Sequence, residues 1–102
     1  MVDVDQMRAD LLTARKARDK VTEVALKRAL AAFDNAAAPP IDAHPGEVEV
    51  ARLELTPDEL AGVLRAELNE ADAAAAQYDA GGRPDAAVQL RVESAVLRRY
   101  LS

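Results

Sequence analysis

Apolar residues recur every three or four positions through most of the chain, the spacing that places them on one face of a helix. Asp3 or Asp5 can cap a first helix over about residues 4–17, and Asp19 can cap a second over about residues 20–38. The polar step Arg18-Asp19-Lys20 connects them. The expected buried faces are Val4, Met7, Leu11 and Ala14, then Leu26, Leu30, Phe33 and Ala37.

A third helix is predicted to begin at Thr56-Pro57-Asp58-Glu59. The threonine can cap the helix, the proline suits the first helical position, and the glutamate completes a capping box. The pattern predicts a helix over residues 57–80, which Gly81-Gly82 ends, and a fourth over residues 84–101, which Pro84 begins. The expected buried stripe of the third is Leu60, Leu64, Leu68, Ala71, Ala75 and Tyr78, and that of the fourth is Ala87, Leu90, Leu97 and Leu101.

Residues 39–55 break the helical pattern with prolines, a glycine and acidic residues. Residues 47–50 alternate like a strand, but over too short a stretch to predict more than a loop with an edge strand as the alternative. The sequence therefore predicts an all-α fold in which four helices form two antiparallel hairpins, with a long third helix and an acidic loop between the second and third. A length of 102 residues indicates one domain, residues 1–102.

The composition predicts a thin core. Much of the apolar content of the chain is alanine, which buries little area, and the aromatic residues are only Phe33, Tyr78 and Tyr100. The chain has no cysteine, which excludes disulfides and thiolate metal sites. No apolar run approaches a membrane span, and no signal peptide is evident, so we expect no membrane contact and a cytoplasmic location.

Charge is distributed unevenly along the chain. Residues 8–28 hold seven basic and three acidic residues, whereas residues 34–72 hold two basic and ten acidic ones. The basic residues that could neutralise RNA phosphates are Arg15, Lys16, Arg18, Lys20, Lys27 and Arg28. The alternative is that these cations interact favourably with the negative end of the helix dipole at the end of the first helix and keep the surface soluble. No aromatic residue lies within this stretch of sequence, so we expect any RNA contact to be with the backbone and to depend strongly on salt.

No self-contained active site is evident. His44 is the one histidine and has no cysteine or second histidine as a companion ligand, so we interpret it as a solvated loop residue. Glu67 and Glu70 lack the Glu-x-x-His partner of a di-metal helical site. The Gly81-Gly82 turn lacks the strand and lysine of a phosphate-binding loop. We expect no catalytic, cofactor-binding or metal-binding residues.

The order of these features resembles the amino-terminal helical domain of the GatB/YqeY family. The residues that carry the resemblance are Asp19-Lys20, Val24–Leu30, Leu55–Leu60, Tyr78–Asp85 and Glu93–Leu101. Members of this family resemble the tail of the B subunit of the tRNA-dependent amidotransferase, which helps to hold tRNA while catalysis takes place in other domains. The resemblance therefore implies an accessory role with tRNA or a tRNA-modifying complex as partner, and any amidotransferase or carbon–nitrogen ligase activity would belong to the family rather than to residues of this chain.

The resemblance also has departures. Stand-alone members continue beyond the Tyr-Leu near residue 101 into a second helical domain, so we expect this chain to be a short form without it. The loop at residues 39–55 is also longer and more acidic than we expect for a member of the family. Two hypotheses follow: an RNA-associated accessory module, or a protein interaction module that uses the apolar faces of the third and fourth helices, for example in a homodimer.

Overall fold

The computed structural model describes residues 1–38 and 54–101. These residues form four α-helices, α1 (Val4–Ala17), α2 (Lys20–Ala37), α3 (Pro57–Ala80) and α4 (Pro84–Arg98), followed by the 3-10 turn η1 (Arg99–Leu101). The all-helical prediction is confirmed. Two helix ends differ from the predicted bounds. The second helix ends at Ala37 rather than at about residue 38, and the fourth α-helix ends at Arg98 rather than at about residue 101, because its last turn tightens to a 3-10 turn, as helix ends often do. Most of the predicted acidic loop, with His44, lies outside the described residues.

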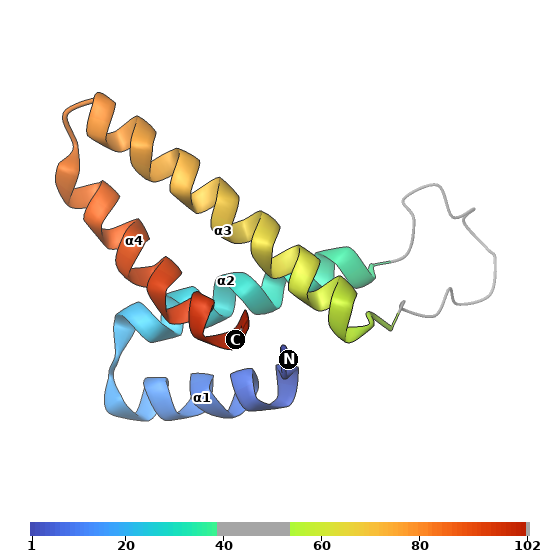
Figure 1. Cartoon of the computed structure of the whole chain (residues 1–102). Helices are drawn as coiled ribbons and strands as arrows, with labels where there is room; N and C mark the ends of the chain where they lie inside the picture. Colours follow the sequence, from blue (N-terminus) through green and yellow to red (C-terminus); the bar gives the residue numbers. More distant parts are fainter. Residues whose placement is uncertain (39–53, 102) are drawn as a thin grey trace, which may run out of the picture.

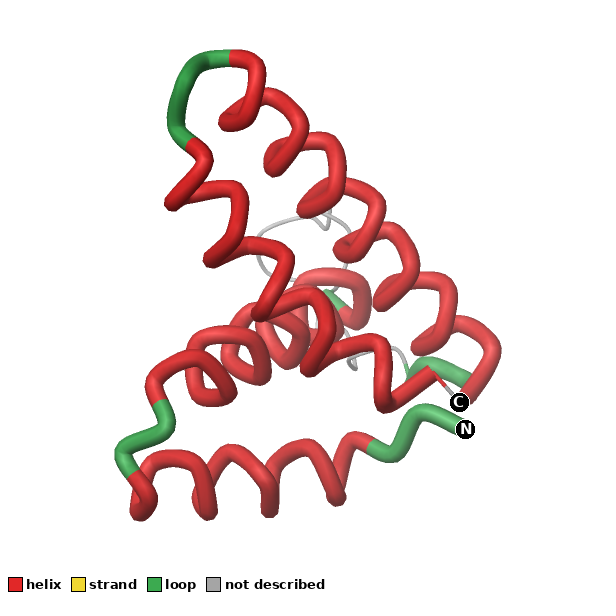
Figure 2. Tube along the Cα trace, turned by 60° about the vertical axis from the view of Figure 1, so that its left-hand side comes forward, coloured by secondary structure: helices red, strands yellow, loops and turns green. Residues whose placement is uncertain are grey.

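The helices pair as two antiparallel hairpins (Figure 1). α1 packs on α2, and α3 makes its most extensive contact with α4. α2 also packs against both α3 and α4, so that the first hairpin crosses one end of the second (Figures 1 and 2). The other end of the α3–α4 hairpin extends past α2. The N-terminus and the end of η1 lie near this crossing (Figure 2).

Local capping chemistry explains where the helices begin. Asp3 accepts a hydrogen bond from the Gln6 backbone N–H at 3.1 Å, which decides between the two aspartates that could have capped α1. Thr56 and Glu59 form both bonds of the predicted capping box, each 3.1 Å long. At the end of α3, Gly82 has a φ of +76°, in the left-handed region that glycine adopts without strain.

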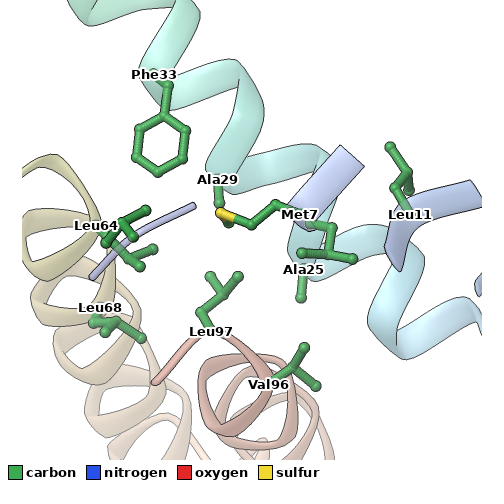
Figure 3. Close-up of a cluster of buried hydrophobic side chains, with 11 residues drawn as sticks. Met7, Leu11, Ala25, Ala29, Phe33, Leu64, Leu68, Val96 and Leu97 are labelled. Carbon is green, nitrogen blue, oxygen red and sulfur yellow. The ribbon is translucent and has the colours of Figure 1, made fainter. Parts of the chain in front are cut away.

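The core lies where the two hairpins cross. Figure 3 shows Met7 and Leu11 of α1, Phe33 of α2, Leu64 and Leu68 of α3, and Val96 and Leu97 of α4 directed into one cluster, with Ala25 and Ala29 of α2 between them. Ala71 and Ala75 of α3 and Ala87 of α4 are also buried. Since alanine side chains are short, they let the α3 and α4 backbones approach closely where larger residues are absent. The core is rich in alanine, as the composition predicts.

One residue that the sequence predicts to be buried is exposed. Tyr78 belongs to the apolar stripe of α3, but it is 38% exposed. It lies in the last turn of α3, in the end of the hairpin that α2 does not cover (Figure 1). Its ring instead receives the Arg83 guanidinium, whose carbon lies 5.6 Å from the ring centre, a cation–π contact. Periodicity selects the face of a helix, but it does not say how far along the helix a partner reaches.

Candidate nucleic-acid interface

The connection between α1 and α2 gathers four of the six cations that the sequence singled out. Arg15 and Lys16 lie in the last turn of α1, Arg18 is its C-cap, and Lys20 is the first residue of α2. We call these four residues the basic turn; all are exposed. Their position at a helix C-terminus is electrostatically favourable, because the free carbonyls there carry partial negative charge.

Arg18 holds an unusual backbone conformation. Its φ is 57° and its ψ 33°, and among the described non-glycine residues only Arg18 has a positive φ. The Asp19 N–H donates to the Ala14 carbonyl at 2.9 Å and the Arg18 N–H to the Arg15 carbonyl at 3.2 Å, which closes α1 with a Schellman-type cap. Such a position usually holds glycine, because a side chain in the left-handed region costs about 1–2 kcal/mol. A long cation occupies this site despite that cost.

Three of the candidate cations form ion pairs with the same carboxylate. Glu23 of α2 pairs with Arg15 at 3.7 Å, with Lys20 at 3.7 Å and with Lys27 at 3.6 Å, and its side chain is only 14% exposed. Within the parts of the chain that the structure describes, Lys16 and Arg18 form no ion pair. The group therefore retains positive charge after its internal pairing, and the unpaired charge sits on the turn itself.

Arg28 is placed differently. Its side chain lies between α2, α3 and α4, with Nη1 3.3 Å from Glu93 Oε1 and Nε 3.5 Å from Glu67 Oε2. Glu93 is buried, and its other oxygen accepts a hydrogen bond from Gln89 at 3.0 Å. The structure thus does not bring Arg28 to the basic turn. It joins the two hairpins through ion pairs.

A recess of about 280 Å³ opens beside the basic turn, between α1, the start of α2 and the end of the chain's last helix. Its lining includes Asp10 and Ala17 of α1, the α2 cap Asp19, and Arg99 and Tyr100 of η1. We call it the turn recess. An aromatic side chain and a further arginine therefore lie next to the basic turn, which the sequence did not reveal. No local pattern could have shown it, because Tyr100 and Asp10 are 90 residues apart.

Hydrogen bonds fix two groups of this recess. The Tyr100 hydroxyl donates to Asp10 Oδ2 at 2.6 Å, and partial burial together with this bond to a carboxylate raises the pKa of Tyr100 to about 12. Asp19 accepts from the Thr22 hydroxyl at 2.7 Å and from the Thr22 N–H at 3.2 Å. These bonds lower the pKa of Asp19, with a smaller contribution from the charge of Arg99. Asp19 is therefore a carboxylate at neutral pH.

Glu67, one of the two carboxylates considered for a di-metal site, has a structural role because it pairs with Arg28. In residues 1–38 and 54–101, no three side chains of the histidine, cysteine or carboxylate type come together in a way that could hold a metal ion. None of the described helices has the length and apolar character needed to cross a membrane.

Comparison with known proteins gives one match. A family model described as Yqey-like protein matches residues 4–102, nearly the whole chain. Neither the curated proteins nor the solved structures contain a match.

Proposed function

Because the chain belongs to the YqeY-like family over residues 4–102, we propose that it is a non-catalytic accessory domain that contacts RNA through the basic turn. tRNA is the RNA that the resemblance of the sequence to GatB/YqeY proteins implies. The cations would bind phosphates, so the interaction would depend little on sequence and strongly on salt.

Arg18 is the observation that carries the proposal. Strained backbone conformations persist at functional sites, where the side chain is worth more than the stability it costs. Glycine in this position would cap α1 at least as well, and the cap bonds are made by the backbone alone. An arginine there gains no ion pair among the described residues, and its favourable interaction with the helix C-terminus, about 0.3–1 kcal/mol, is smaller than the strain of about 1–2 kcal/mol. A contact with an external anion would supply the difference.

The test is a titration of the purified protein against bulk tRNA, followed by fluorescence anisotropy at low and at physiological salt. In the test variant, Arg15, Lys16, Arg18 and Lys20 become glutamine. In a charge-matched control, the four exposed arginines Arg8, Arg65, Arg83 and Arg91, which lie outside the basic turn, become glutamine. Both variants lose the same net charge, so a difference between them reports position.

We expect the test variant to bind at least tenfold more weakly than the control, with a shallower dependence of log K on log salt, because fewer counterions are released. Absence of tRNA binding by the unmodified protein at low salt would refute the proposal. Equal loss in both variants would assign the binding to net charge and would also refute the role of the basic turn.

A second candidate is a protein interaction module. Val88 and Val92 are exposed and one turn apart on α4, and Val24 of α2 is exposed as well. Two apolar side chains one turn apart, such as Val88 and Val92, can pack against a partner helix. This candidate predicts a complex or a homodimer that forms at micromolar concentration and that salt barely weakens. Sedimentation velocity of the protein alone, at both salt concentrations, distinguishes it from the RNA-binding proposal.

A further inference from the structure

The turn recess opens beside the basic turn. Ala17 and Asp19 line the recess and flank Arg18, so this residue of the turn stands at its edge. Its floor is apolar, formed by the buried side chains of Ala14 and Val96. At about 280 Å³ it falls just below the usual range for drug-sized ligands, about 300–1,000 Å³, and so suits a smaller flat group.

Two carboxylates, Asp10 and Asp19, and one cation, Arg99, line the recess. The hydroxyl hydrogens at its rim are already donated within the protein: Tyr100 donates to Asp10 at 2.6 Å, Thr22 to Asp19 at 2.7 Å, and Thr13 to the Ala9 carbonyl at 3.2 Å. The carboxylate and hydroxyl oxygens keep lone pairs that can accept further hydrogen bonds, whereas the Arg99 guanidinium is the donor group of the lining. Because the carboxylates outnumber the guanidinium, the rim favours a ligand edge that carries an N–H group over one that carries only carbonyl oxygens.

The same carboxylates disfavour a phosphate inside the recess. Asp10 and Asp19 would repel it and Arg99 offsets only one of these two charges, whereas Arg18, between the lining residues Ala17 and Asp19, would attract it. A nucleotide satisfies both requirements if its phosphate lies over the basic turn and its base enters the recess. Single-stranded RNA is recognised in this way, with unstacked bases against apolar or aromatic surfaces and their edges hydrogen-bonded.

From this arrangement we propose that the turn recess accepts an unpaired base that carries an exocyclic amine, such as cytosine, in preference to uracil. The inference rests on the proposed function and adds a base preference to the backbone contact. Aspartate and glutamate accept hydrogen bonds from the N4 amine of cytosine, whereas uracil presents a carbonyl oxygen at the same place. A good base contact of this kind changes the affinity by roughly fivefold to a hundredfold.

The test compares short oligocytidine and oligouridine of equal length by anisotropy at low salt. The two carry the same phosphates, and both are pyrimidine strands, so electrostatic attraction is matched. We expect the protein to bind oligocytidine about tenfold more tightly. Ala17→Leu fills the recess from an exposed position without changing any charge, and it should reduce oligocytidine binding to the level of oligouridine.

Asp19→Asn is a second variant that keeps the fold, because asparagine caps helices as well as aspartate does. Its amide supplies a donor, so the ratio of cytidine to uridine affinity should fall even if both affinities rise. Circular dichroism confirms that each variant is folded.

If the unmodified protein binds the two oligomers equally and the basic-turn variant binds neither, the base preference of the turn recess is refuted. The proposed function then remains intact. A cytidine preference that survives Ala17→Leu would also refute the role of the turn recess, because the preference would arise elsewhere. Failure of both oligomers and of tRNA to bind would refute the proposed function itself.

Discussion

Arg28 and Glu93 form the ion pair whose disruption should most affect the stability of this domain. Glu93 has a side chain that is 7% exposed, and Arg28 is 32% exposed. Their contact at 3.3 Å joins α2 to α4, and Arg28 also pairs with Glu67 of α3 at 3.5 Å. Removing the cation leaves a carboxylate in the interior without its partner, whereas removing the carboxylate leaves a cation that can still reach Glu67 and water. The two losses should therefore differ in size.

The magnitude follows from burial. Removing one partner of a buried ion pair costs about 3–5 kcal/mol. We expect Arg28→Met to fall at the lower end, about 3 kcal/mol, since Gln89 still donates to Glu93 and Arg28 is partly solvated. For a domain of this size that corresponds to a decrease in Tm of roughly 12–24 °C. Glu93→Met should stay within about 1 kcal/mol of the unmodified protein, because an apolar side chain suits the buried position.

Urea unfolding followed by circular dichroism at 222 nm measures these differences, with the double variant Arg28→Met/Glu93→Met as the control. The double variant should recover most of the stability that Arg28→Met loses, because it no longer buries an unpaired charge. If Glu93→Met costs as much as Arg28→Met, or the double variant recovers nothing, the electrostatic explanation is refuted and packing of the side chains accounts for the loss.

Four further outcomes are expected. Arg18→Gly should stabilise the protein by about 0.5–1 kcal/mol, the left-handed strain less the extra chain entropy of glycine, while it weakens tRNA binding; loss of stability would contradict the strain argument. Gly82→Ala should destabilise by about 1 kcal/mol for the opposite reason, measured by the urea midpoint. Ser94→Ala should stabilise by up to about 1 kcal/mol with an unchanged urea m-value, because the buried Ser94 hydroxyl has no hydrogen-bond partner among the described residues. Because the pKa of Tyr100 is raised from 10.0 to about 12, the folded state holds a proton that the unfolded state releases, so stability should decline as pH rises through this interval. Tyr100→Phe should remove that part of the decline, and an identical pH profile in the variant would rule out Tyr100 as its source.

Local sequence determined the beginnings of three helices. Asp3, Asp19 and Thr56 each cap a helix through atoms within three residues, so their chemistry is complete without any tertiary contact. The same holds for Gly82, whose left-handed conformation belongs to a turn of a few residues. Hydrophobic periodicity likewise identified Met7, Leu26, Leu64 and Leu97 as core residues, because the face of a helix is set by its 3.6-residue repeat.

Only the tertiary structure decided which charged residues remain available to a ligand. In the sequence, Arg28 is one of a run of cations, but the crossing of the hairpins places it between Glu67 and Glu93. The same crossing brings Tyr100 to Asp10 and so forms the turn recess beside the basic turn. Capping and periodicity act within a few residues along the chain and are therefore written in the local sequence. Ion pairing and recesses depend on which helices meet, and that is settled by how the whole set of apolar faces packs together.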